Sequence, residues 1–168
     1  MTGHTHAIAG AAAGALASEV LRLPVGLLQV AAMLGAVAAL LPDVDEPGST
    51  VNRRLPVLGP LLGRGLKHRT VTHSLVALGG LTLAAHLLLP HVPWAWLAVG
   101  AAGYGSHLFC DLLTPAGIDL FWPSRGRVRL GGWVKTGGGV EEGLFLPGFA
   151  MALVWALWRG VRLARGLL

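Results

Sequence analysis

Long apolar runs, separated by proline residues or by polar connections, set the pattern of this chain. Four runs meet the length that a helix needs to cross a bilayer, roughly 20 residues at about 1.5 Å rise, and a fifth nearly does. The runs cover residues 6–21, 25–41, 72–89, 94–113 and 144–160. Pro24, Pro42 and Pro90 follow three of them, and a residue without a backbone N–H is disfavoured within a helix. The pattern predicts a single domain over residues 1–168, an all-α, polytopic transmembrane helical bundle of about five helices.

The composition agrees with a lipid environment. Hydrophobic residues make up 54% of the chain and charged residues only 12%, with a mean hydropathy of +0.64. A soluble domain carries about 25% charged residues and could not bury this much apolar surface at this size. Gly10 and Gly14 in the first run form a small-xxx-small face, which allows another helix to approach closely.

The basic residues indicate an orientation. An up-down bundle places the N-terminus and the two long connections, 42–71 and 114–143, on one side of the membrane. These connections carry nine of the thirteen Lys and Arg residues: Arg53, Arg54, Arg64, Lys67, Arg69, Arg125, Arg127, Arg129 and Lys135. The positive-inside rule then makes that side the cytoplasm. Anionic lipids account for the net charge of +5 better than nucleic acid does, although a basic patch over a phosphate-bearing substrate would produce the same bias.

Side chains that bind metals gather at the segment ends on this same side. His107 and Asp111, spaced i,i+4 near the end of the fourth run, lie on one helical face and can chelate one cation. Ionisable groups in an apolar segment are costly, which favours a functional interpretation. The alternative is a helix-end histidine beside a capping aspartate.

Two further patterns lie in the first long connection. Asp43 and Asp45 are close enough to repel each other unless a cation or an arginine compensates; the alternative is a solvated acidic turn. His68 and His73 precede the third run, and their i,i+5 spacing excludes a zinc-protease HExxH site. Arg69 beside them suits bidentate binding of a phosphate, while a basic cluster facing lipid headgroups is the alternative.

The predicted start of the third helix and two further residues, His6 and Glu141, complete the set of candidate metal ligands. Thr70 or Thr72 is the predicted N-cap of the third run, which would place His73 in the first helical turn. His6, at the start of the first run, and Glu141, before the fifth, could add ligands. Glu141 equally fits a carboxylate that the dipole of a helix N-terminus favours.

Taken together, these motifs resemble the YdjM-like family of membrane-bound metal-dependent hydrolases. The resemblance covers residues 5–145 and rests on Thr5-His6, Leu41–Asp45, His68-Arg69, Thr72–Ser74, Ser106-His107, Asp111–Gly117, Leu120–Pro123 and a Glu before the last run. It implies an inner-membrane hydrolase, described in some members as LexA-binding, with distant similarity to zinc-dependent phospholipase C and P1-type nucleases. The implied ligands are His6, Asp43, His73, His107, Asp111 and Glu141, with Asp45 and His68 as ligands or their immediate neighbours. The histidines are too few for a trinuclear site, so one or two ions are expected.

These features predict hydrolysis of a phosphoester in a lipid or lipid-linked substrate. Mixed His and carboxylate ligands favour zinc, with manganese or iron as alternatives. Asp45 is the expected general base or bridging ligand, and His68 and Arg69 would stabilise charge on the phosphate. Arg125, Arg127 and Arg129 would gather anionic headgroups together with Arg69.

The sequence is also compatible with other functions. The main alternative is a membrane-embedded interaction or regulatory protein with a structural metal site, and homo-oligomerisation is compatible with either function. A transporter is disfavoured because the centres of the apolar runs lack ionisable residues.

Overall fold

Five α-helices make up most of the residues that the structure describes. The computed structural model describes residues 1–46, 48–49, 70–124 and 126–166. The helices within these residues are α1 (Gly3–Val20), α2 (Leu28–Ala38), α5 (Leu75–Leu88), α6 (Trp94–Leu112) and α7 (Leu146–Ala164). Shorter helical turns are η1 (Val25–Leu27), η2 (Leu41–Asp45) and η3 (Glu141–Phe145), the last being a π-helical turn that leads into α7. The all-α prediction is confirmed for the described residues, where extended segments pair only in one isolated antiparallel bridge, Ile118 with Val128.

Among the described residues, one helical stretch is long and apolar enough to cross a membrane on its own. It runs from Glu141 to Ala164, 24 residues, and an 18-residue part of it has a mean hydropathy of 1.5. In the part of the chain that the structure describes, Val25–Ala38 and Leu75–Leu88 are apolar but shorter. The second predicted run is divided, because α2 ends at Ala38 and Pro42 lies in the separate turn η2.

Glycines let α1, α2 and α6 pack with their backbones in close approach. A Cβ atom added at Gly10, Gly14 or Gly103 would come under 3.0 Å from an atom of α2 or the residue that follows it. Gly35 lies at the centre of this junction, since a Cβ there would come equally close to the backbone of Gly10 and Gly14. The small-xxx-small face predicted from the sequence is therefore confirmed as a helix-packing surface.

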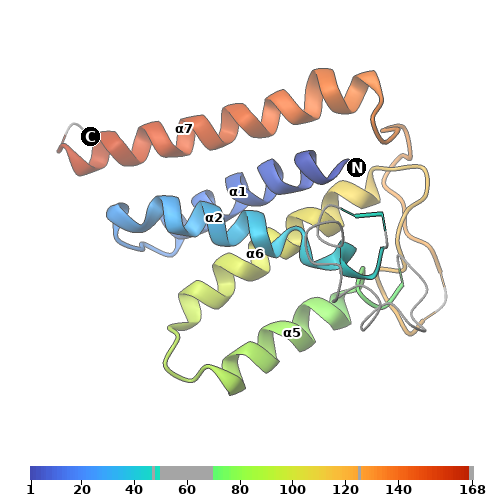
Figure 1. Cartoon of the computed structure of the whole chain (residues 1–168), viewed down its shortest axis with the longest axis horizontal. Helices are drawn as coiled ribbons and strands as arrows, with labels where there is room; N and C mark the ends of the chain where they lie inside the picture. Colours follow the sequence, from blue (N-terminus) through green and yellow to red (C-terminus); the bar gives the residue numbers. More distant parts are fainter. Residues whose placement is uncertain (47, 50–69, 125, 167–168) are drawn as a thin grey trace.

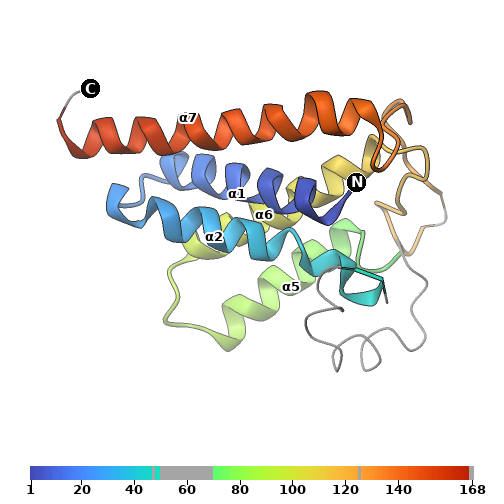
Figure 2. The same ribbon diagram turned by 45° about the horizontal axis from the view of Figure 1, so that its top comes forward.

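The ends of the elements show which segments meet. Figures 1 and 2 show the N-terminus, the end of α2, the start of α5, the end of α6 and the start of α7 at one end of the bundle, and the C-terminus at the other. The described parts of both long connections therefore share an end with the N-terminus, as the up-down topology predicts. Helix α5 packs mainly on α6 and diverges from α2 away from this end (Figure 1).

Candidate metal centre

Five side chains from four segments of the chain, two of them on α6, converge at the end of the bundle that holds the N-terminus. Their ligand atoms form two groups, within each of which all atoms lie within 4.8 Å of one another. The first group is His6, His107 and Asp111, and the second is Asp43, His73 and His107. His107 belongs to both groups, so the two form one continuous cluster.

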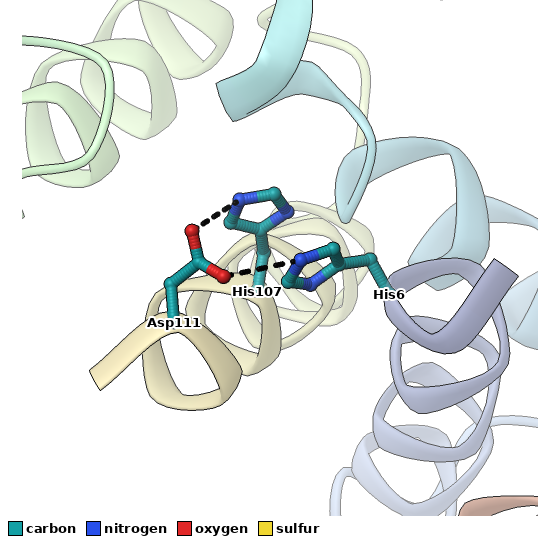
Figure 3. Close-up of side chains that lie close together, drawn as sticks. All are labelled: His6, His107 and Asp111. Carbon is teal, nitrogen blue, oxygen red and sulfur yellow. Dashed lines mark ion pairs between the residues drawn. The ribbon is translucent and has the colours of Figure 1, made fainter. Parts of the chain in front are cut away.

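Asp111 lies close to all three histidines. Its Oδ1 is 3.3 Å from His6 Nε2, and its Oδ2 is 3.8 Å from His107 Nε2 and 3.7 Å from His73 Nε2. Figure 3 shows the carboxylate of α6 turned toward the rings of His6 and His107, and these two rings stack with centroids 3.7 Å apart. The amino group of Met1 donates to Asp111 Oδ1 at 2.7 Å. All three histidines and Asp111 are at most 1% exposed.

The second group is equally tight. His107 Nε2 is 3.1 Å from His73 Nε2 and 3.6 Å from Asp43 Oδ1, and His73 Nε2 is 3.4 Å from the same carboxylate oxygen. Asp43 has a side chain 20% exposed, so it is the member of the cluster that reaches the surface.

One backbone contact and one side-chain contact orient two of the rings. His107 Nδ1 lies 2.7 Å from the Ala39 carbonyl oxygen, and because a carbonyl only accepts, this nitrogen carries the proton. In the neutral ring Nε2 is then left with a lone pair aimed into the cluster, the arrangement typical of metal-binding histidines. His73 Nδ1 lies 3.0 Å from the Thr72 hydroxyl oxygen Oγ1, which can donate or accept, so this contact orients the ring without fixing its tautomer.

The spacing of the donor atoms fits a small cation. Zinc binds nitrogen and oxygen at about 2.0–2.1 Å, so two ligands of a tetrahedral site lie roughly 3.3 Å apart. The measured separations of 3.1 to 3.8 Å are close to this value. The ring nitrogen Nδ1 of His6 is buried and has no hydrogen-bond partner among the described residues. A buried polar atom of this kind calls for an explanation, and a bound ion near the ring would provide one. The residues present therefore suit one or two ions, with His107 adjacent to both positions.

Asp43 is available as an anionic ligand. Burial raises the pKa of its carboxyl group, but the hydrogen bond with His73 and the nearby rings of His107 and His6 outweigh burial and lower the pKa to about 2. Asp43 is therefore ionised at neutral pH and binds a cation without first losing a proton.

The start of α5 corrects one prediction. Ser74 is the N-cap of α5, and its Oγ accepts from Ala77 N at 3.1 Å, so the predicted caps Thr70 and Thr72 were wrong. His73 consequently precedes the helix instead of lying in its first turn. The Tyr104 hydroxyl donates to the Thr72 carbonyl, and this contact holds the segment that carries His73 against α6.

Glu141 lies outside both groups. Its Oε1 accepts from Thr2 N and Thr5 Oγ1, each at 2.6 Å, and its Oε2 accepts from Gly137 N at 2.9 Å. The carboxylate is fully buried and anchors the beginning of α1, the element that carries His6. This placement favours the alternative of a carboxylate at a helix N-terminus.

Glu141→Gln separates anchoring from ligation. Because the amide nitrogen cannot accept the bonds of the carboxylate, we expect a loss of about 1.5–3 kcal/mol in stability, measured by thermal unfolding in detergent. Metal bound per folded chain should stay at the wild-type value. The exposed neighbour Glu142→Gln is the control and should leave both quantities unchanged. A folded Glu141→Gln protein without metal would return this residue to the ligand set.

Comparisons with known proteins agree with the membrane character of the chain. The model of the YdjM inner membrane protein family matches residues 1–166. The chain belongs to this family. Inner membrane protein YdjM of Escherichia coli (strain K12) and of Shigella flexneri are each 38% identical to it over 126 residues, which are 73% of this chain and 62% of those relatives. The match thus spans less than two thirds of the YdjM relatives' length.

A relative of similar size is also found. The protein YvsG of Bacillus subtilis (strain 168) is 35% identical over 153 residues, which are 90% of this chain and 91% of the relative. No solved structure matches the chain.

The remaining predicted site residues lie outside the cluster or outside the residues that the structure describes. His68, Arg69 and Arg125 lie outside the described residues; the backbone of Asp45 belongs to η2, and its side chain is likewise outside them. Arg127 and Arg129 lie on the 114–143 connection, where they donate to the carbonyl oxygens of Ala116 and Pro115 at 3.2 and 3.4 Å. The structure therefore brings together five of the predicted ligands and leaves Arg127 and Arg129 on the surface loop.

Sequence reasoning missed three supporting residues. Ala39 acts through its carbonyl oxygen, which a side-chain pattern does not reveal. Thr5 donates to the buried carboxylate of Glu141, although its position next to His6 gave a signal that could have been used. Tyr104 is the single tyrosine of the chain and precedes His107 by one helical turn, and this isolated hydroxyl in an apolar run could also have been noticed.

Proposed function

We propose that the protein is a multi-pass enzyme of the inner membrane that hydrolyses a phosphoester in a lipid or lipid-linked substrate, using one or two bound metal ions. The observation that carries the proposal is the buried pair of ligand groups that share His107. Three imidazoles and two carboxylates at these separations suit zinc first, with manganese or iron as alternatives.

The surface of the bundle supports several membrane crossings. Met33 of α2, Leu83 of α5 and Met151 of α7 are 69%, 58% and 70% exposed. Large apolar side chains repeated over several helices are costly in water and ordinary against lipid. At the C-terminal end, Arg159 lies 5.3 Å from the Trp155 ring, a pairing that suits the boundary between lipid and water. The metal cluster would lie at the opposite boundary, which the positive-inside rule makes cytoplasmic.

The ligands suggest how the reaction is arranged. A divalent ion held by these residues would supply Lewis-acid polarisation of a phosphoryl oxygen and would lower the pKa of a coordinated water to about 7. His6, His73, His107 and Asp111 are buried and hold the geometry fixed, whereas Asp43 borders the surface from which a substrate can approach. Asp45, in the same turn as Asp43, is the proposed base. His68 and Arg69 are proposed to stabilise the phosphate, and Arg125, Arg127 and Arg129 to gather anionic headgroups.

Burial also favours a second candidate, a structural metal in a membrane-embedded interaction protein. Four of the five ligands are at most 1% exposed, and structural zinc sites are closed whereas catalytic sites keep an open position. Cobalt substitution distinguishes the two functions. A visible spectrum that changes when inorganic phosphate is added indicates an open position, and an unchanged spectrum favours the structural site.

The proposed reaction predicts metal-dependent loss of phospholipid. Zinc-loaded protein in mixed micelles with bacterial polar lipids should produce new phosphorus NMR signals, and His107→Ala should reduce the rate at least about 100-fold, the scale of removing one element of a catalytic constellation. His86→Ala, an exposed histidine of α5, is the control and should retain the wild-type rate. Full metal loading without cleavage of any phospholipid or nucleotide would favour the structural role.

A further inference from the structure

A cavity of about 410 Å³ lies between α2, α5 and α6. It exists because α5 packs on α6 while diverging from α2 (Figures 1 and 2). Leu34 of α2, Leu81 of α5 and Leu97 of α6 are among the side chains that line it. We call this space the α2–α5–α6 groove.

The lining offers little to a polar ligand. Its two hydroxyl groups already donate within the protein, Thr82 Oγ1 to the Leu78 carbonyl at 2.8 Å and the Tyr104 hydroxyl to the Thr72 carbonyl. The other lining side chains are apolar except for the indole N–H of Trp96. A polar ligand would lose its hydrogen bonds with water and regain few here, so the lining favours a hydrocarbon.

The groove ends at the metal cluster. Its lining residues Ala38 and Leu41 flank the segment whose Ala39 carbonyl orients His107. Leu41 precedes the partly exposed ligand Asp43 by two positions, and Tyr104 of the lining precedes His107 by one helical turn. Along α6 the groove extends from Trp96 to Tyr104, about 12 Å at the helical rise. An apolar slot that ends beside a candidate cation site complements an amphiphile with an anionic head.

The sides of the groove face the surroundings with apolar side chains. Leu41 of η2 and Leu81 of α5, both of which line the groove, are 44% and 52% exposed. An acyl chain of a lipid already in the bilayer could therefore enter laterally between α2 and α5. A second acyl chain of the same lipid would stay in the bilayer. This lateral route suits a diacyl lipid.

We propose that the α2–α5–α6 groove binds one acyl chain of a diacyl phospholipid and so brings its phosphoester to Asp43 and the metal cluster. The proposal rests on the proposed function and narrows its substrate class from phosphoesters in general to membrane phospholipids. Binding of the acyl chain needs no turnover, so it can be measured separately from hydrolysis.

Two glycine substitutions test the groove. Gly100 lines it, and a Cβ at Gly100 meets no atom within 4 Å, so Gly100→Leu adds bulk inside the groove without a backbone clash. Gly79→Leu on α5 is the matched control, because it meets no atom within 4 Å and is not among the residues that line the groove. Both changes replace a helical glycine with leucine, so their intrinsic effects on helix formation are alike.

The measurement is native mass spectrometry of the full chain with dioleoyl phosphatidylglycerol in detergent containing a chelator. We expect one retained lipid per wild-type and Gly79→Leu chain, and affinity at least about tenfold lower for Gly100→Leu, since excluding two buried methylene groups suffices for that loss. Equal lipid binding by Gly100→Leu would overturn the groove and leave the proposed hydrolysis standing. Preferential retention of farnesyl phosphate, or a wild-type dimer that Gly100→Leu dissociates, would assign the groove to another occupant and also overturn it.

The hydrolysis assay keeps the two ideas distinguishable. Lipid binding that Gly100→Leu abolishes, together with zinc-loaded wild-type protein that cleaves nothing, would support the groove and reject the enzyme. Cleavage of short-chain and long-chain phospholipids at the same rate by wild-type and Gly100→Leu protein would support the enzyme and reject the groove.

Discussion

Replacing Gly35 with leucine is expected to prevent α1, α2 and α6 from assembling. A Cβ at Gly35 would lie under 3.0 Å from the backbone of Gly10 and Gly14, and Gly103 packs on Gly35 from the third helix. Relief would require separation of helix backbones, because a shift of flexible side chains does not remove these contacts. Overpacking a core costs about 1–3 kcal/mol and occasionally more. The cost at this junction should exceed about 3 kcal/mol, a large part of a net stability of about 5–15 kcal/mol.

The yield of monodisperse protein on size exclusion and the helical signal on heating measure this effect. Gly105→Leu, on α6, is the control, because a Cβ there meets no atom within 4 Å. The control should purify and unfold as the wild type does, whereas Gly35→Leu should aggregate or melt at a much lower temperature. A Gly35→Leu protein with wild-type stability would mean that the three helices do not meet at this glycine.

His107→Ala is expected to abolish metal binding at both groups. His107 is the member that the two groups share, so its loss leaves each with two side chains. Even removal of a residue that only orients a ligand lowers metal affinity about 10–100-fold, so removal of the shared ligand should exceed about 100-fold. His6→Ala and Asp43→Asn each remove a ligand from one group and should leave the other group able to bind.

Competition with a zinc-sensitive chelating dye, with the purified apoprotein, measures these affinities. His86→Ala and His91→Ala are suitable controls because both histidines are exposed and lie at the opposite end of α5 or in the connection that follows it. If His107→Ala bound zinc as tightly as the wild type, the shared-ligand arrangement would be wrong. Equal loss in all three variants would instead indicate a single ion held by the whole cluster.

The sequence specified the helices more completely than it specified their ends. Apolar runs, three of them followed by prolines, located the five α-helices of the described residues, because lipid-facing and buried helical surfaces both require apolar residues. The start of α5 was misplaced because Thr70, Thr72 and Ser74 can each cap a helix. The choice depends on tertiary contacts, such as the hydrogen bond from Leu75 N to the Leu120 carbonyl at 2.9 Å.

The candidate site was predicted through topology. An up-down bundle places His6, Asp43, His73, His107 and Asp111 at one end, and the structure brings these five side chains together. Glu141 lies at the same end, but topology gives no indication of direction, and its carboxylate turns toward Thr2 and Thr5 instead of the histidines. The α2–α5–α6 groove was equally inaccessible to the sequence, because it depends on the angle between α5 and α2.

Elemental mass spectrometry of the protein purified in detergent, beside His107→Ala/Asp111→Ala, tests the central claim most directly. The cluster predicts one or two zinc, manganese or iron ions per wild-type chain and none in the double variant. The double variant must remain a monodisperse helical protein for the comparison to count, and its helical signal verifies this. Wild-type protein without metal after reconstitution, or a double variant that keeps the wild-type amount, would contradict the assignment of this cluster as a metal centre.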